Sequence, residues 1–393
     1  MNKKIQQQMN ASGKNRRQFI KNATSAMGGI AFLSALPNSL KARTKKYENR
    51  RNNKLDKVPS RIRFAVIGIN HGHINSQVDT VIRGGGSFVS FYAKEADLAA
   101  NFAKLYPQAK AAVSEKDILE DRSIHLIICA AIPDERAAIG IAAMRHNKDF
   151  LVDKPAVTTL QQLAEVRDVQ ADTGRIYTVQ YGRLENRGSL KAGELVKAGA
   201  IGKVIQTMAL APHRINPKTR PSWFFDSKRY GGIINDLGSH QFDEFLFFTG
   251  SSKADIVASQ AANLHHPQKP GFEDFGDVMV TGDSGTGYMR LDWFTPEGLQ
   301  SWGDDRVTIL GTDGYIEVRK NIDIAGRPGG SHLFLVNQKE TKYFDCAKHP
   351  LPFGKLFVDD ILNRTNTSMQ QDLCFLATEL ALKAQKQART IKI

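Results

Sequence analysis

The fold is decided by Ile62-Arg63-Phe64-Ala65-Val66-Ile67-Gly68-Ile69-Asn70-His71-Gly72-His73. An almost unbroken apolar run ends at Gly68, and a helix is expected from about residue 74 to 82. Unbroken apolar runs are typical of strands in a parallel sheet, because helices cover both faces of such a sheet. The stretch therefore predicts a buried first strand that leads through a glycine turn into a helix.

Strands and helices continue to alternate up to about residue 180. We expect strands at 88–93, 126–130, 150–152 and 176–180, and helices at 98–105, 135–145 and 160–172. This order predicts an α/β domain with a doubly wound parallel sheet, a Rossmann arrangement whose ligands bind at the carboxyl ends of the strands.

The turn after the first strand is a degenerate form of the dinucleotide-binding fingerprint, which has three glycines. Gly68 fits the first position, Asn70 occupies the second and His73 the third, while Gly72 is displaced by one residue. Asparagine tolerates left-handed backbone better than most residues, so the turn is feasible. We therefore take Gly68, Asn70, His71, Gly72 and His73 as candidate cofactor contacts.

The second strand ends in Tyr92-Ala93-Lys94-Glu95. A dinucleotide site usually has an acid here for the ribose hydroxyls, but Ala93 holds that place and Glu95 follows two residues later. Lys94 suits the extra phosphate of NADP, or it is a solvated residue at a helix start. The sequence thus leaves NAD and NADP both open, with Glu95 as a candidate ribose contact.

Residues beyond 182 predict a different architecture. Expected strands lie at 204–211, 256–262, 276–281, 287–294, 306–310 and 315–318, and expected helices at 189–197, 353–362 and 373–387. Alternating strands with helices on one face predict an α+β domain with an open, mostly antiparallel sheet.

One helix in this second part carries a titratable pair. Gly231-Gly232-Ile233-Ile234-Asn235-Asp236-Leu237-Gly238-Ser239-His240 predicts a glycine turn followed by a helix. Asp236 and His240 are four residues apart, so they share a helix face, as a proton-transfer site requires. The alternative is an acid stabilised by the helix dipole beside an ordinary core histidine.

The strand at 150–152 is followed by Asp153-Lys154-Pro155, which places a lysine at the carboxyl end of a parallel strand. With the glycine turn and the Asp236/His240 helix, this resembles the Gfo/Idh/MocA oxidoreductase family, which has Glu-Lys-Pro here and a downstream GG-x4-D-x3-H element. Asp153 departs from the pattern by one methylene. Shorter similarities at 132–134, 199–204, 223–225 and 310–314 follow in the family's order.

The resemblance implies an oxidoreductase that moves a hydride between tightly bound NAD or NADP and a secondary alcohol of a sugar. It implies that His240 exchanges the hydroxyl proton, that Lys154 stabilises the reacting oxygen and that Asp236 orients the substrate or the histidine. Further candidates are Pro133 and Pro155 toward the cofactor, and Arg183, His213 and Trp223 toward the substrate. The open sheet implies a homo-oligomer.

Two alternatives stay open at this stage. Some NAD-using glycoside hydrolases resemble this sequence equally in fold and leader, and a secreted sugar-binding protein without chemistry would also suit the degenerate turn. No CxxC or HExxH pattern is present, so no metal site is predicted. Cys129 is expected in the core, whereas Cys346 and Cys374 could pair in an oxidising compartment.

Charge is concentrated near the N-terminus. Residues 1–60 carry 14 Lys and Arg against two Asp and Glu, so +12 of the formal charge of +14 lies there and residues 61–393 carry only +2. A nucleic-acid partner is therefore not predicted. Arg16-Arg17 followed by the weakly apolar segment 23–36 resembles a Tat export signal. We expect a leader and linker at 1–58, a dinucleotide-binding domain at 59–182, a substrate domain at 183–393, and a periplasmic protein.

Replacing both Arg16 and Arg17 by lysine should keep the protein in the cytoplasm, because the Tat machinery requires the twin arginines. Cell fractionation with an antibody to the protein measures this. An unchanged distribution between cytoplasm and periplasm would refute the assignment of the leader.

Overall fold

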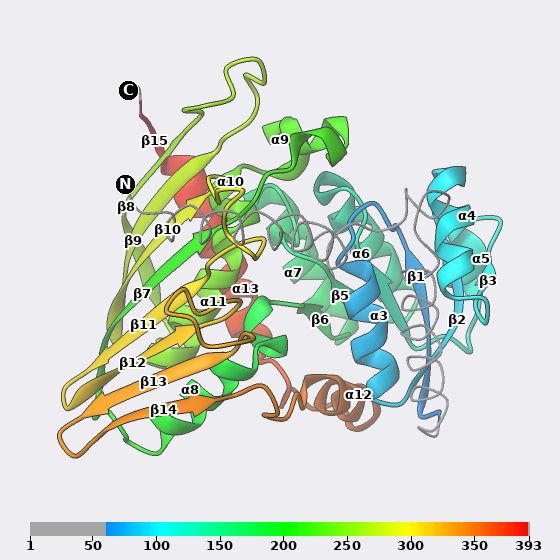
Figure 1. Cartoon of the computed structure of the whole chain (residues 1–393). Coiled ribbons are helices and arrows are strands. Elements are labelled where there is room, and N and C mark those ends of the chain that lie inside the picture. The colour runs from blue at the N-terminus through cyan, green and yellow to red at the C-terminus, as the bar shows by residue number, and fades with distance from the viewer. Residues whose placement is uncertain (1–59, 392–393) are drawn as a thin grey trace, which may run out of the picture. The chain divides into compact units, whose positions relative to one another are not determined.

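The computed structural model describes residues 60–391, and Val58–Ile393 forms one compact unit. This unit contains two sheets (Figure 1). The predicted export signal and linker lie outside the described residues. Among the residues described, no helix combines the length and the apolar character needed to cross a membrane.

The first sheet has six parallel strands in the order β3-β2-β1-β4-β5-β6. The strands are β1 (Ile62–Ile67), β2 (Gly86–Tyr92), β3 (Lys110–Ala111), β4 (Leu126–Cys129), β5 (Asp149–Val152) and β6 (Tyr177–Val179). The helices between them are α3 (Ile74–Arg83), α4 (Ala96–Leu105), α5 (Glu115–Glu120), α6 (Arg136–Arg145) and α7 (Leu160–Thr173).

The order of the strands reverses between β1 and β4. Right-handed crossovers on either side of this point put α3 and α4 on one face of the sheet and α6 and α7 on the other. Every residue of β4 and β5 is buried, as continuous apolar runs require. The carboxyl ends of β1 and β4 therefore meet at a topological switch point, where doubly wound sheets bind their ligands.

The second sheet has nine strands in the order β14-β13-β12-β11-β7-β10-β9-β8-β15. They are β7 (Val204–Pro212), β8 (Ala254–Ala262), β9 (Phe275–Gly282), β10 (Gly285–Asp292), β11 (Arg306–Gly311), β12 (Gly314–Arg319), β13 (His332–Asn337), β14 (Thr341–Asp345) and β15 (Arg389–Thr390). Only the pairs β7–β10 and β8–β15 are parallel.

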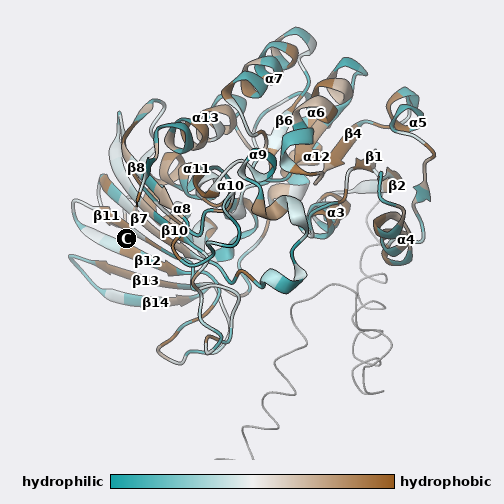
Figure 2. Cartoon of the chain, turned by 90° about the horizontal axis from the view of Figure 1, so that it is seen from above, coloured by the Kyte–Doolittle hydropathy of each residue, from teal (hydrophilic) through white to brown (hydrophobic). Residues whose placement is uncertain are grey.

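Helices lie on one face of this sheet. The long ones are α8 (Arg187–Lys197), α11 (Gly238–Thr249) and α13 (Gln371–Gln387), with the single turns α9 (Ser227–Tyr230) and α10 (Ile233–Asp236) near them. In both views the other face of the sheet is not covered by any described helix (Figures 1 and 2). Apolar residues packed between the helices and the sheet form the core of this half.

The structure confirms the predicted fold class: a doubly wound parallel sheet followed by an open, mostly antiparallel sheet. It also corrects one element. Asp236 and His240 were predicted on a single helix, but Asp236 ends α10 and His240 lies in the first turn of α11, with Leu237 between the two helices. Because the backbone of Leu237 is itself helical, the two side chains keep nearly the spacing of one continuous helix.

The end of the chain returns to the first sheet. Helix α12 (Phe353–Asn363) packs on α3, and α13 packs on α7 and β6 as well as on α11. Glycines make the α12–α3 contact close: a Cβ at Gly354 would collide with the carbonyl oxygen of Thr80, and a Cβ at Gly84 would collide with that of Gly354. These contacts join the two halves of the unit away from the switch point.

Gly354→Ala tests this contact. Alanine favours a helix over glycine by up to about 1 kcal/mol, but its Cβ would meet backbone, which no side-chain rotation can relieve. We expect a net loss of about 1 to 3 kcal/mol in the free energy of unfolding, measured by urea denaturation. Gly298→Ala, where nothing lies within 4 Å of the added Cβ, should change stability by less than about 0.5 kcal/mol. Equal stability of both variants and the natural protein would contradict the prediction.

Candidate active site

The glycine turn lies at the switch point. Gly68 has a φ of +82°, and a Cβ there would collide with Ala131, which follows β4. The amide of Ala130 donates to the carbonyl of Gly68 at 3.1 Å, so the ends of β1 and β4 are held together. Helix α3 starts here without an acidic residue in its first turn, and the positive end of its dipole favours an anion. This is a suitable place for the pyrophosphate of a dinucleotide.

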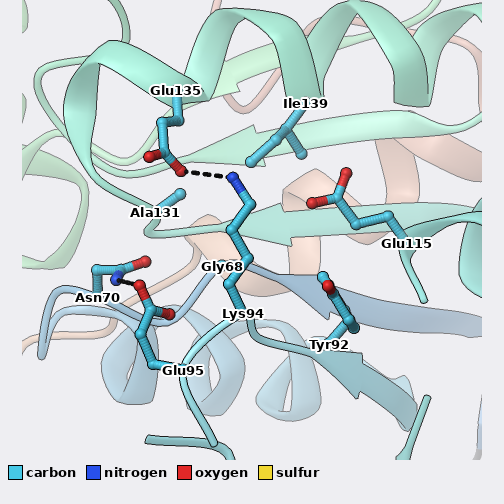
Figure 3. A pocket seen from close by; sticks show the side chains of 9 residues that line it. All are labelled: Gly68, Asn70, Tyr92, Lys94, Glu95, Glu115, Ala131, Glu135 and Ile139. Atoms are coloured by element: carbon cyan, nitrogen blue, oxygen red, sulfur yellow. Dashed lines mark hydrogen bonds and ion pairs between the residues drawn. The ribbon is translucent and has the colours of Figure 1, made fainter. Parts of the chain in front are cut away.

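A small pocket opens beside the turn, at the ends of β2 and β4 (Figure 3). It is a shallow hollow of about 210 Å³, a volume that includes open solvent, and it is lined by Gly68, Ala131 and several charged side chains. Asn70 Nδ2 donates to Glu95 Oε1 at 2.7 Å, and Lys94 Nζ donates to Glu135 Oε2 at 3.0 Å. Pro133 is buried at the start of the turn that precedes α6. These residues fit the adenosine end of NAD or NADP.

Asp153 connects the glycine turn to the end of β5. Its two carboxylate oxygens each lie 3.0 Å from the Nδ1 of a histidine, His71 on one side and His73 on the other. Burial alone would raise the pKa of Asp153, but His73, Arg136 and His71 outweigh it and hold the pKa well below its usual value. Burial and the neighbouring His73 lower the pKa of His71 to about 4, so this ring is neutral at neutral pH.

Arg136, which the sequence did not suggest, completes this cluster. Its side chain is 1% exposed. It donates to the carbonyls of Ala131, Asp153 and Pro155 at 2.8 to 2.9 Å and to the Asp153 carboxylate at 3.2 Å. One guanidinium thus fixes the chain directly after both β4 and β5.

The same cluster has the composition of a metal site. Ligand atoms of His71, His73 and Asp153 all lie within 4.8 Å of one another. However, both imidazoles already bond the carboxylate, and Arg136 already supplies a positive charge to it. These contacts explain the cluster as a support for the turn. The absence of a bound metal remains a prediction from the sequence.

Lys154 and Asp236 meet between the two sheets. Lys154 Nζ donates to Asp236 Oδ1 at 2.8 Å, and both residues are buried. Lys154 comes from the end of β5, next to buried Pro155 across a cis peptide bond. Asp236 comes from the end of α10 in the second half of the chain. An ammonium group is thereby held by a carboxylate at the edge of the cofactor crevice.

His240 lies one helical turn beyond Asp236. The amide of Gly182 donates to its Nδ1 at 2.9 Å, so the neutral ring carries its hydrogen on Nε2. Burial, followed by the charge of Lys154, holds the pKa of His240 well below its usual value. The imidazole is therefore a neutral hydrogen-bond donor.

His213 has the opposite polarity. Its Nδ1 bonds the carbonyl of Ala211 at 3.1 Å, so its Nε2 is left as an acceptor. Burial lowers the pKa of His213 to about 3. The charges of Lys154 and Asp236 also act on this pKa, so the ring lies near the reacting groups. Its ring lies 4.5 Å from that of Trp302.

Arg183 and Trp223 each have partners within the protein. Arg183 is buried, and its Nε and Nη2 both donate to Asp243 at 2.8 Å, while its guanidinium lies 4.1 Å from the ring centre of Phe247. This side chain is committed to holding α11. Trp223 lies in the single turn Ser222–Phe225 and contacts Phe224.

Two further cations lie close to the reacting groups. Arg220 stacks 4.5 Å above the ring of Phe224, and the charge of Asp236 acts on it. Lys320 bonds Glu244 at 2.8 Å, one turn beyond His240 on α11, and its charge acts on His240. No local pattern marks either residue in the sequence, because each is brought to the crevice by tertiary packing.

Two family models match the chain. The oxidoreductase family with an NAD-binding Rossmann fold matches residues 62–181, and the Gfo/Idh/MocA C-terminal domain matches residues 189–317. Together these cover the first sheet with its crevice and most of the second sheet.

Several proteins are similar over much of the chain. A crystal structure of a candidate oxidoreductase from Erwinia carotovora atroseptica is 44% identical, with a TM-score of 0.82, and the match covers 84% of this chain and all of that one. Levoglucosan dehydrogenase of Pseudarthrobacter phenanthrenivorans is 22% identical over 57% of each chain. The NAD⁺-dependent scyllo-inositol 2-dehydrogenase of Bacillus subtilis is 26% identical over 58% of this chain and 66% of its own. The chain thus spans less than two thirds of these curated relatives, but the two family models and the Erwinia structure show that it belongs to the Gfo/Idh/MocA oxidoreductase family.

Proposed function

We propose that the chain is an NAD(P)-dependent oxidoreductase acting on a secondary alcohol of a sugar or polyol. The observation that carries the proposal is the buried pair of Lys154 and Asp236 at 2.8 Å, which joins the end of β5 to the second half of the chain beside the cofactor crevice. The named relatives act, by their names, on levoglucosan and scyllo-inositol, which supports a polyhydroxylated substrate.

Each residue has a role that its geometry supports. The bound nicotinamide supplies the chemistry of hydride exchange with the alcohol carbon. When the alcohol is oxidised, the neutral amine of Lys154 takes the proton of the reacting oxygen, and in the reverse direction the ammonium returns it; Asp236 holds the ammonium in place. His240, with its hydrogen on Nε2, donates a hydrogen bond to that oxygen and stabilises its developing negative charge. His213 accepts a bond from a neighbouring hydroxyl.

This scheme gives His240 a different role from the one implied by the sequence resemblance, in which it takes the proton itself. The amide of Gly182 occupies the nitrogen that would have to carry the hydrogen for Nε2 to accept one. A neutral ring in this tautomer can donate to the substrate but has no lone pair to offer at Nε2.

We also propose that copies of the chain associate through the uncovered face of the second sheet. Exposed Met279 and Met208 lie on either side of the half-buried Tyr288, and on two other strands there exposed Leu310 lies opposite exposed Tyr315. Contiguous apolar surface of this kind marks interaction sites.

The remaining proposals follow from the leader. A Tat signal would export the folded protein with its coenzyme, so we propose a periplasmic location and a coenzyme bound tightly enough to survive export.

The NAD-using glycoside hydrolase and the non-catalytic sugar-binding protein stay alternatives from the sequence. Neither of the two curated relatives described above carries such a name.

The function is tested by mixing purified protein with NAD⁺ or NADP⁺ and a panel of sugars and polyols, including levoglucosan and scyllo-inositol. We expect coenzyme reduction, followed by absorbance, with at least one of them. Cleavage of a glycoside without net coenzyme reduction would instead support the hydrolase, and binding of sugar without either reaction would support the binding protein.

Lys154→Met and His240→Ala should each reduce turnover by about 100-fold or more, the usual scale for losing a positioned proton donor or a charge-stabilising hydrogen bond. Lys154→Met leaves Asp236 as an unpaired buried carboxylate, which lowers stability. The double variant Lys154→Met/Asp236→Asn removes that charge, so activity that is still lost in it comes from the lost chemistry and not from lost stability. Lys116→Met on the exposed face of α5 is the matched control. Full activity of the folded Lys154 variant would refute its role.

The pH profile tests the role of His240. Because its pKa is held well below the usual value, the ring stays neutral above pH 6. The profile of kcat/KM should therefore show no inflection from this residue between about pH 6 and 8, where an ordinary histidine titrates. An inflection near pH 6.5 that disappears in His240→Gln would contradict this assignment.

A further inference from the structure

The pocket beside the glycine turn has an excess of negative charge. Three glutamates line it, Glu95 from the start of α4, Glu115 from the start of α5 and Glu135 from the start of α6, against the single cation Lys94 (Figure 3). The formal charge of the lining residues is therefore −2. The three carboxylates come from separate loops after β2, β3 and β4, so the fold and not a local run of acids brings them together.

Lys94 is already neutralised in this pocket. Its Nζ bonds Glu135 Oε2 at 3.0 Å, and this bond is the main reason why the pKa of Lys94 is raised, with Glu115 and Glu95 acting in the same direction. Glu135 cannot easily turn away, because Arg229 Nη2 bonds its other oxygen at 3.0 Å. The charge of Arg229 is in turn balanced by Asp134 at 2.8 Å.

The other two carboxylates have no cation of their own. Among the described residues, only the uncharged amide of Asn70 bonds the Glu95 carboxylate, through Oε1, which leaves Oε2 for another donor. No ion pair is formed by Glu115 within residues 60–391, and its carboxylate points into the same space as Lys94 (Figure 3).

We infer that this chain selects NAD over NADP, and that Glu95, Glu115 and Glu135 are the residues that make the selection. The inference rests on the proposed function, because it assumes that the pocket holds the adenosine end of the coenzyme. An unmodified ribose offers hydroxyl donors, which a free carboxylate oxygen accepts. A 2′-phosphate carries a charge of about −1.5 to −2 near neutral pH and would be repelled by the net negative charge of the pocket.

The position of Lys94 at the end of β2 would by itself favour NADP, so the two effects must be weighed. Lys94 could reach a phosphate only by sharing its ammonium with Glu135, and the two uncompensated carboxylates would remain. A dianion entering a pocket of net charge −2 meets more repulsion than one shared lysine can offset. The acid that usually binds the ribose is missing at Ala93, and Glu95 takes its place from two residues further on.

The test is the equilibrium binding of NADH and NADPH to the full-length protein, followed by coenzyme fluorescence, after any copurified coenzyme has been identified by mass spectrometry and removed. We expect NADH to bind at least tenfold more tightly, and any copurified coenzyme to be NAD. Raising the salt concentration should narrow the difference, because screening weakens the repulsion of the phosphate.

Variants assign the effect to residues. Glu115→Gln and Glu135→Gln should tighten NADPH by about threefold to tenfold and leave NADH nearly unchanged, whereas Glu95→Ala should weaken NADH by about tenfold through loss of the hydroxyl acceptor. Glu120→Gln, an exposed position on α5 outside the pocket, is the matched control and should change neither constant.

The outcomes separate this inference from the function on which it rests. Tighter binding of NADPH, abolished by Lys94→Ala, would overturn the coenzyme preference and leave the oxidoreductase proposal standing. A preference for NADH that is the same in Glu115→Gln and Glu135→Gln as in the natural protein would likewise refute the selective role of these residues. Failure of both coenzymes to bind the natural protein would overturn the proposed function and this inference with it.

Discussion

One buried guanidinium holds the two strand ends on which the site depends. Arg136 bonds the chain after β4 at Ala131 and after β5 at Asp153 and Pro155. A charge that is 1% exposed is stabilised only if it is paired and fully hydrogen-bonded, and Asp153 provides the pairing. Removing one partner of such a pair typically costs about 3 to 5 kcal/mol. Lys154 follows Asp153 in the sequence. Its backbone is therefore fixed by the interior of the first sheet and not by the crevice itself.

The same pair explains how an irregular glycine turn can function. His73 stands at the third glycine position of the fingerprint, and His71 lies next to Asn70 at the second, and both rings bond Asp153. Gly68 is the one position in the turn that cannot change, because its φ is positive and a Cβ would meet Ala131. Asp153, which stands where the family pattern has Glu, thus bonds three side chains, His71, His73 and Arg136. A shorter acid that accepts two imidazoles and a guanidinium can hold the turn without the second and third glycines.

Much of the fold could be predicted from the sequence, because continuous apolar strands and amphipathic helices are local patterns. Strands β1, β2, β4 and β5 were predicted to within about two residues. Strand β3 has only two residues, both exposed, so it leaves no hydrophobic pattern. The strands β13 and β14 were not predicted, although β13 is largely apolar and half of its residues are buried. Motifs in the sequence predicted that Lys154 and Asp236 belong to one site. The sequence could not show that Arg183 is bound to Asp243 or that Arg220 and Lys320 approach the crevice. These contacts join residues far apart in the chain.

The two ends of the crevice select by different physical means. At the adenosine end, carboxylates outnumber cations, so a ligand is selected by its charge. At the reacting end, Lys154 and Asp236 balance each other, and burial keeps His213 and His240 uncharged near neutral pH. A sugar or polyol without a formal charge gains nothing from net charge, so it has to be held by the direction of hydrogen bonds. One ring donates through Nε2 and the other accepts through Nε2, and the backbone fixes each tautomer, at Gly182 for His240 and at Ala211 for His213. Under the proposed function, the backbone at Gly182 and Ala211 therefore directs the hydrogen bonds that the two rings offer to the substrate.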